Sequence, residues 1–172
     1  MAIVTSARAG MNAAERATII QLRAPQATAR RAAEEASALV ASSPAPVVVS
    51  SRCDIALAVA AAGVNLPEND ITVQAARRLL GERLVGRSVH SLDTALRAEA
   101  DGADYVIFGP VWPSPSHPGS TPAGIDMLAA VAHALTIPVL AIGGVTEERI
   151  AQSLAAGASG YAAIGFFTRP RS

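Results

Sequence analysis

Short apolar segments recur along the chain, and longer segments rich in alanine and charged residues separate them. Val47-Val-Val and Val139-Leu-Ala-Ile are apolar at successive positions, which is typical of strands buried on both faces of a parallel sheet. The pattern predicts eight strands, at Ala2–Thr5, Thr18–Arg23, Val47–Ser51, Gly63–Leu66, Leu84–Val89, Tyr105–Val111, Pro138–Gly143 and Gly160–Gly165.

The segments between the predicted strands have the composition and the end signals of helices. Gln26–Ala41 carries alanine and glutamate throughout, and Ser91 and Thr146 are suited to cap the helices that follow them. Three stretches run from a helix end through a glycine into a strand, beginning at Ala61, Ala100 and Ala155. This alternation of strands and helices predicts βα units.

Eight such units favour a closed (β/α)8 TIM barrel over an open doubly wound sheet, with residues 1–172 as a single domain. Ser6–Ala17 is too short for a full first helix with its loops, and only Phe166–Ser172 follows the last predicted strand. We therefore expect a small barrel with reduced first and last helices. Phe166, Phe167 and Trp112 would cover the apolar surface this leaves, or a second subunit would cover it in a homodimer.

Composition narrows the classes of function. Lysine and arginine together number 14, as do aspartate and glutamate, so the formal net charge is zero. The chain has no basic excess and no basic segments interleaved with aromatics, which argues against a nucleic-acid partner. The sequence contains no lysine, so a lysine Schiff base is excluded as the catalytic device. Cys53 is the single cysteine and is expected to be a buried structural thiol.

No apolar run is long enough to span a membrane, and no signal peptide is recognisable. These observations predict a cytoplasmic protein without a membrane partner.

Glycines end the last two predicted strands. Gly143 and Gly144 follow one apolar run, and Ala163-Ile-Gly165 ends the other. Glycine lets backbone N–H groups approach a ligand closely, and two adjacent ends of this kind form a nest of donors suited to a phosphate. In eight-stranded barrels the loops after the last two strands commonly bind phosphate. The sequence therefore predicts a phosphorylated small molecule as ligand, bound by Gly143, Gly144, Ala163, Ile164 and Gly165.

Polar residues at the other strand ends are the remaining candidates for chemistry, because active sites of this fold lie at the C-terminal ends of the strands. They are Gln21, Arg23, Ser50, Ser51, Arg52, Asn65, Glu68, Asp70, Ser88 and His90, with Ser114, Ser116 and His117 in the loop Trp112–Thr121.

The three histidines are expected to have different roles. His117 titrates near neutral pH when unperturbed and is the first candidate for an acid, a base or a phosphate contact. His90 lies one residue into its loop, where it either takes part in catalysis or only supports the strand. His133 is expected on a helix surface.

Charged residues at the strand ends leave alternatives open. Arg23 and Arg52 carry guanidinium forks suited to phosphate or carboxylate, but each is nearly as well suited to a salt bridge at the barrel rim. Asp70 and Glu68 are the acids that a metal ion would use, but two acids in one loop do not form a strong metal-binding pattern.

Six segments, in order along nearly the whole chain, resemble the thiamine-phosphate synthase/TenI family. They are Gln21-Leu-Arg23, Val48-Val-Ser-Ser-Arg52, Gly86-Arg-Ser-Val-His-Ser91, Ala103-Asp-Tyr-Val-Ile-Phe-Gly-Pro-Val111, Pro138-Val-Leu-Ala-Ile-Gly-Gly144 and Gly157-Ala-Ser-Gly-Tyr-Ala162. The resemblance implies a thiazole phosphate as ligand. With the strand-end positions, it implies substrate contacts at Gln21, Arg23, Arg52, Ser88, Ser114 and Ser116.

The family has two branches. TenI proteins isomerise a thiazole carboxylate phosphate, whereas the synthases join a pyrimidine diphosphate to the thiazole phosphate with the help of magnesium. Gly86–Ser91 and Val64-Asn-Leu-Pro67 look closer to the TenI branch.

Several positions depart from the synthase pattern. Ala24 and Pro25 replace a glutamate and a lysine, and Ser50-Ser51 replaces an asparagine and an aspartate that resembles a magnesium ligand. Ser114-Pro-Ser116-His117 keeps two hydroxyls of the synthase loop but loses its lysine. Asp70 aligns with the second metal aspartate. A diphosphate leaving group needs charge neutralisation, so these losses argue against synthase activity.

The TenI pattern is also altered, because Pro110 stands at its catalytic histidine and leaves His117 as the nearest replacement. The serine that the family has at position 165 is glycine here.

The main expectation is a TenI-like protein that binds a thiazole phosphate and, if catalytic, isomerises a thiazole carboxylate phosphate without a cofactor. His117 and His90 are its catalytic candidates. A first alternative is a thiamine-phosphate synthase, which would need Mg²⁺ with Asp70 as a ligand. A second is a non-catalytic regulatory protein that binds phosphate.

Overall fold

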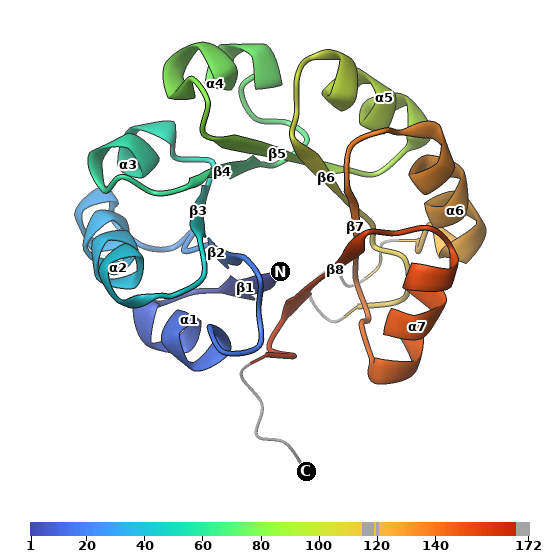
Figure 1. The fold of residues 1–172 in the computed structure, drawn as a ribbon, viewed down its shortest axis with the longest axis horizontal. Helices are drawn as coiled ribbons and strands as arrows, with labels where there is room; N and C mark the ends of the chain where they lie inside the picture. Colours follow the sequence, from blue (N-terminus) through green and yellow to red (C-terminus); the bar gives the residue numbers. More distant parts are fainter. Residues whose placement is uncertain (115–118, 120, 168–172) are drawn as a thin grey trace.

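The structure, a computed structural model, describes residues 1–114, 119 and 121–167. Its eight parallel strands form a closed barrel in chain order, and Figure 1 shows the helices arranged around it. The strands are β1 (Ala2–Val4), β2 (Ile20–Leu22), β3 (Val47–Ser50), β4 (Gly63–Leu66), β5 (Leu84–Val89), β6 (Tyr105–Phe108), β7 (Val139–Ile142) and β8 (Gly160–Ile164). The helices are α1 (Ala7–Ala13), α2 (Ala29–Ser42), α3 (Cys53–Ala58), α4 (Val73–Leu80), α5 (Leu92–Ala100), α6 (Gly124–Ala134) and α7 (Glu147–Ala155).

The ring closes where the first strand meets the last. Ala2 of β1 is in register with Ile20 of β2 on one side and with Ala163 of β8 on the other. The predicted (β/α)8 barrel is therefore confirmed, and the open doubly wound sheet is excluded. Most strands are one or more residues shorter than predicted. The sixth ends at Phe108 rather than Val111, because Pro110 has no backbone N–H to continue a ladder.

Side-chain caps explain where several helices begin. The hydroxyls of Ser91 and Thr146 accept hydrogen bonds from the backbone N–H three residues on, as the sequence predicts. The first helix is short, at seven residues, and its cap is Ser6.

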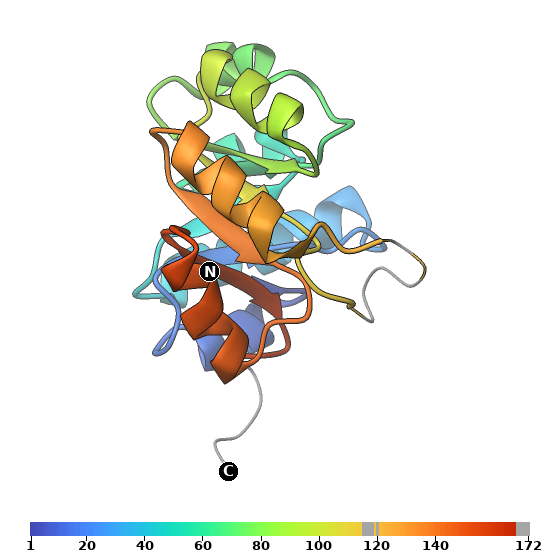
Figure 2. The same cartoon turned by 90° about the vertical axis from the view of Figure 1, so that its right-hand side faces the viewer.

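Two apolar layers hold the barrel together. The larger lies between the strands and the helices, and a second fills the barrel interior with Met1, Ile3, Val48, Tyr105, Ile107 and Ala162. Figure 2 gives the side view of the helices along the outside of the barrel. The Cys53 thiol is free and buried, as predicted.

Aromatic residues pack together at the end of β8. Phe167 is 5% exposed and its ring stacks on Tyr161 with centroids 5.6 Å apart, while Phe166 meets both rings edge-on. No helix in the described part of the chain is long and apolar enough to cross a membrane.

Candidate active site

One cavity of about 430 Å³ opens among the C-terminal ends of the strands. Its lining includes nine of the residues predicted to act in catalysis or to bind substrate or phosphate: Gln21, Arg23, Ser88, His90, Ser114, Gly143, Gly144, Ala163 and Ile164. The chain contributes these residues from β2, β5, β6, β7 and β8 or the loops that follow them, so the parallel barrel brings distant segments to one place. Ser50, Asn65 and Glu68 also line the cavity.

Two buried amides belong to the polar part of the cavity wall. Gln21 and Asn65 are each 2% exposed. The Asn65 amide nitrogen donates to the Ser88 hydroxyl at 3.0 Å. Within the described residues, no group hydrogen-bonds to the Gln21 Oε1 or the Asn65 Oδ1. An unpaired buried acceptor is costly, so both oxygens are suited to bind donors of a ligand or of water.

His90 and Glu68 meet at the cavity edge. The His90 Nδ1 contacts the Gly109 carbonyl oxygen. Because a carbonyl only accepts, Nδ1 carries a proton and neutral His90 has its lone pair on Nε2. That Nε2 is 4.0 Å from the Glu68 Oε2, and the Glu68 Oε1 accepts from the His90 backbone N–H at 3.2 Å.

Arg87 holds the loop that carries Glu68. Its guanidinium donates to the carbonyl oxygens of Glu68 and Ile71, each at 2.7 Å. Burial lowers the pKa of Arg87 from its ordinary value. The Arg87 side chain therefore holds the backbone of this loop in place through these two hydrogen bonds.

The glycine turn after β7 is packed closely against the loop after β6. Gly143 and Gly144 have φ angles of +96° and +64°, which L side chains rarely adopt. A Cβ at Gly143 would lie 2.7 Å from the Pro110 Cβ. This turn therefore requires glycine on both counts, and it lines the cavity as the sequence predicts.

Arg52 and Asp70 are not among the residues that line the cavity. Arg52 forms two hydrogen bonds with Asp54, at 2.8 and 2.5 Å, and this pairing lowers the pKa of Asp54 to about 2. The Asp70 Oδ1 accepts from the Ile71 N–H at 2.7 Å. The structure thus realises the salt bridge left open for Arg52.

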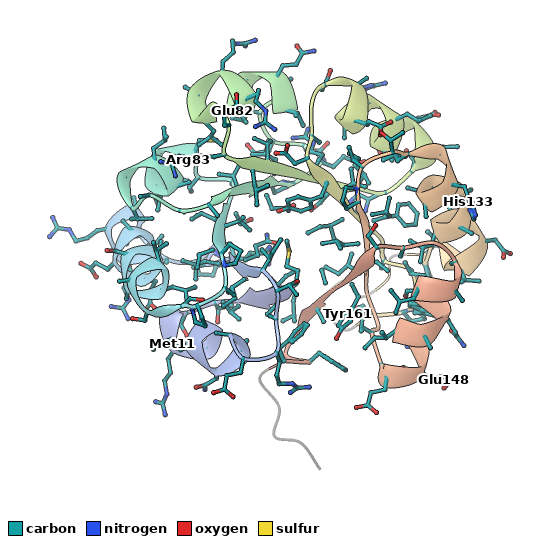
Figure 3. All side chains as sticks on the ribbon, viewed as in Figure 1. Met11, Glu82, Arg83, His133, Glu148 and Tyr161 are labelled. Atoms are coloured by element: carbon teal, nitrogen blue, oxygen red, sulfur yellow. The ribbon has the colours of Figure 1, made fainter. Side chains whose placement is uncertain are left out.

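The other predicted residues are placed as follows. Gly165 has a φ of +77° and follows the lining residues Ala163 and Ile164. Ser116 and His117 lie outside the described residues, so their roles stay predictions. His133 is exposed on α6, as predicted, with its Nδ1 2.7 Å from the Ala129 carbonyl oxygen (Figure 3).

Metal ligands are sparse at this end of the barrel. Among the described residues, no group of three or more His, Cys, Asp or Glu side chains is arranged to hold a metal ion. Glu68 is the acid in the cavity lining. Mg²⁺ in sites that bind phosphate commonly uses only one or two carboxylates together with the ligand's own oxygens, so Glu68 fits an ion held mainly by a bound phosphate. Asp70 is outside the lining, and its role as a metal ligand stays a prediction.

A (β/α)8 barrel with a polar cavity at its C-terminal end and glycine turns after its last two strands is typical of enzymes that act on phosphorylated small molecules. The family model described as thiamine monophosphate synthase matches residues 4–166, and the chain belongs to this family.

Curated relatives and a solved structure agree with the family. The thiamine-phosphate synthase of Chloroflexus aurantiacus is 40% identical over 152 residues, which cover 86% of this chain and 70% of that protein. The thiamine-phosphate synthase of Chlorobium luteolum is 40% identical over 161 residues, or 91% of this chain and 76% of that protein. The thiamine phosphate pyrophosphorylase of Pyrococcus furiosus superposes with a TM-score of 0.85 at 32% identity, covering 95% of this chain and 84% of that one.

These comparisons correct the preferred function. The expectation of a TenI-like isomerase is wrong, because relatives that are 40% identical over most of the chain are named synthases. The expectation against a synthase rested on charges missing at single positions, namely the lysine replaced by Pro25 and the aspartate replaced by Ser51. Such positions at a solvent-accessible rim are weak guides, since other cations and the substrate's metal ion can take over charge neutralisation.

Proposed function

We propose that the protein is a thiamine-phosphate synthase, a transferase that joins hydroxymethylpyrimidine diphosphate to thiazole phosphate and releases diphosphate. The observation that carries the proposal is the agreement of two relatives, each 40% identical over most of the chain, on this activity. The cavity supports it, since it combines an arginine, buried amides and a glycine turn in one space. The same names favour an enzyme over a non-catalytic regulatory protein.

The proposed reaction does not require the protein to remove a proton from the attacking group. The thiazole ring nitrogen forms a bond to the pyrimidine methylene carbon with its lone pair, and the bond from that carbon to the diphosphate oxygen breaks. The attacking nitrogen carries no proton, so no general base is needed to activate it. Proline at position 110 is therefore compatible with the proposed reaction. His90 would orient the substrates through Nε2 rather than act as a base.

The leaving diphosphate needs positive charge. Arg23, at the end of β2, lines the cavity and is exposed there, and its guanidinium matches phosphate oxygens in a bidentate manner. Mg²⁺, when bound with the diphosphate, would neutralise the remaining charge, with Glu68 of the cavity lining as its protein ligand and Asp70, two residues on, as a further candidate. The chain has no lysine, so we assign the binding of the diphosphate oxygens to Arg23.

The two rings and the second phosphate have separate partners in this proposal. The free oxygens of Gln21 and Asn65 accept from the amino group of the pyrimidine, with Ser88 supporting Asn65. Gly143, Gly144 and Ile164 would offer backbone N–H groups to the thiazole phosphate, next to the Ser114 hydroxyl, with Gly165 following in the same turn. The Ala163 N–H is bonded to the Met1 carbonyl oxygen at 3.2 Å, so Ala163 shapes the wall without donating. Ser116 and His117, outside the described residues, remain candidate contacts, whereas Arg52 is paired with Asp54 outside the cavity lining.

Two expectations about organisation also stay proposals. We propose one domain over residues 1–172, and a homodimer that covers apolar surface beside the reduced last helix, such as Leu154 of α7, which is 50% exposed. Sedimentation at the mass of one chain, independent of concentration, would reject the dimer.

The activity is tested with purified protein, both substrates and Mg²⁺, by oxidising the thiamine phosphate formed to its fluorescent thiochrome. Product is expected only when both substrates are present. In Arg23→Ala, we expect the KM for the pyrimidine diphosphate to rise about tenfold or more, with the KM for thiazole phosphate near the wild-type value. Arg78→Ala, at an exposed position of α4, is the matched control. Folded wild-type protein that forms no product would contradict the proposal.

A further inference from the structure

One arginine contacts both loops that frame the phosphate end of the cavity. Arg149, in the first turn of α7, donates from Nη1 to the Gly144 carbonyl oxygen at 2.7 Å. Its guanidinium carbon lies 5.4 Å from the centre of the Trp112 ring, in a cation–π contact. Trp112 belongs to the loop after β6 and Gly144 to the loop after β7. Arg149 therefore links the loop after β6 to the loop after β7, beyond the point where the two strands end.

The contact surrounds Gly144 closely. A Cβ on Gly144 would lie 2.6 Å from the Pro113 carbonyl oxygen, 2.9 Å from the Trp112 Cβ and 3.0 Å from the Arg149 Nη1. All three distances are shorter than ordinary carbon contacts of about 3.5–4.0 Å. The turn is thus enclosed by the loop after β6 on one side and by the guanidinium on another, and its position depends on both.

The hydrogen bond also fixes the direction of a donor. In a trans peptide the carbonyl of one residue and the N–H of the next point in opposite directions. The Gly144 carbonyl points at Arg149, so the Val145 N–H points away from Arg149. Gly144 and Val145 line the cavity, whereas Arg149 is not among its lining residues. The bond to Arg149 therefore fixes the orientation of the Val145 N–H on a turn that lines the cavity.

We propose that Arg149 is a positioning residue for phosphate: it holds the Gly143–Gly144 turn against Trp112 so that backbone donors face the phosphate of the ligand. The inference rests on the phosphate-binding role proposed above for this turn. Arg149 acts through the backbone and does not itself form part of the cavity wall. The guanidinium makes both contacts at once, because it carries several N–H donors on a broad delocalised cation, whereas an ammonium group is a compact point charge.

Binding rather than turnover provides the test. Trp112 is the only tryptophan of the chain, so the tryptophan emission reports on the surroundings of this one ring. Thiazole phosphate and the dephosphorylated thiazole alcohol are titrated into wild type, Arg149→Ala and Arg149→Lys, by calorimetry and by tryptophan fluorescence. Arg78→Ala on α4 is the matched control, since α4 is separated from α7 by α5 and α6 around the barrel (Figure 1).

We expect Arg149→Ala to bind thiazole phosphate about tenfold or more weakly, with the alcohol bound as in wild type. Arg149→Lys should recover only part of that loss, and the emission of the ligand-free protein should shift in Arg149→Ala. Trp112→Leu, measured by calorimetry, should lose phosphate affinity in the same direction and serves if Arg149→Ala does not fold.

Two results would overturn the inference: wild-type phosphate affinity in a folded Arg149→Ala, or equal losses for phosphate and alcohol, which would indicate general damage to the cavity. A wild-type protein that binds thiazole phosphate but forms no thiamine phosphate would refute the synthase proposal while leaving this test intact. A wild-type protein that binds the phosphate no better than the alcohol would refute the positioning role itself.

Discussion

Gly143→Ala separates two physical reasons for the glycine turn that ends β7. The first is backbone strain, because an L residue at the observed φ of +96° costs about 1–2 kcal/mol. The second is overlap, because the new Cβ would lie 2.7 and 2.8 Å from the Cβ and Cα of Pro110. Pro110 is ring-constrained and cannot move aside as a flexible side-chain tip would, and overpacking of this kind costs about 1–3 kcal/mol.

Gly102 supplies a control with nearly the same strain and no overlap. Its φ is +91°, and a Cβ there would have nothing within 4 Å. Gly102→Ala should therefore lose only the strain energy, about 1–2 kcal/mol of unfolding free energy. Gly143→Ala should lose about 1–3 kcal/mol more.

Urea unfolding followed by far-ultraviolet circular dichroism measures both losses, and the linear dependence on urea gives the free energies. In the same samples, thiazole phosphate should bind to Gly102→Ala as to wild type and more weakly to Gly143→Ala. Equal losses of stability in the two variants would show that the contact with Pro110 is not tight, and the reasoning about the turn would fail.

Three further outcomes follow from particular side chains. Gln21→Met should raise the midpoint of thermal unfolding and weaken binding of the pyrimidine diphosphate, because it removes a buried unpaired acceptor that the ligand is proposed to use. A lower midpoint of unfolding would contradict the cost assigned to that acceptor. Arg77→Ala should lose about 1–3 kcal/mol of unfolding free energy at unchanged KM, since Arg77 donates to three backbone carbonyls and to Asp104, just before β6 and away from the cavity. Unchanged stability in urea would refute this structural role of Arg77. Asp54→Asn should reduce stability slightly at pH 5 and less at pH 2.5. The hydrogen bond from Arg52 lowers the pKa of Asp54 from 3.8 to about 2, so the stabilisation by the charged carboxylate is lost as pH falls through that range. The pair is exposed, so the effect should shrink in high salt, and a loss of stability that grows toward low pH would contradict this account.

The fold was predictable because its signals are local. Runs such as Val47-Val-Val mark strands buried on both faces, and the hydroxyls of Ser91 and Thr146 mark helix starts, so eight strands could be placed from the sequence. The glycine ends at Gly143 and Gly144 were also readable, since few other residues tolerate their backbone conformation.

Several features of the site were not predictable because they depend on contacts between remote segments. The bond from Asn65 to Ser88 requires the register of β4 against β5, and the contact of Arg149 with Trp112 joins loops far apart in sequence. Arg52 was suited both to a ligand and to a salt bridge, and only the loop geometry shows that Asp54 binds it. The branch of the family was misjudged for a related reason: charged rim positions do not reveal which other groups supply the same charge.

The central claim is that this cavity joins two phosphorylated heterocycles. Phosphorus NMR of the protein with hydroxymethylpyrimidine diphosphate, thiazole phosphate and Mg²⁺ tests it directly, because substrates and both products are observed together. The account predicts that thiamine phosphate and inorganic diphosphate appear in equal amounts, and that neither appears when thiazole phosphate is omitted. Unchanged substrates beside folded protein, or diphosphate released without thiamine phosphate, would contradict it.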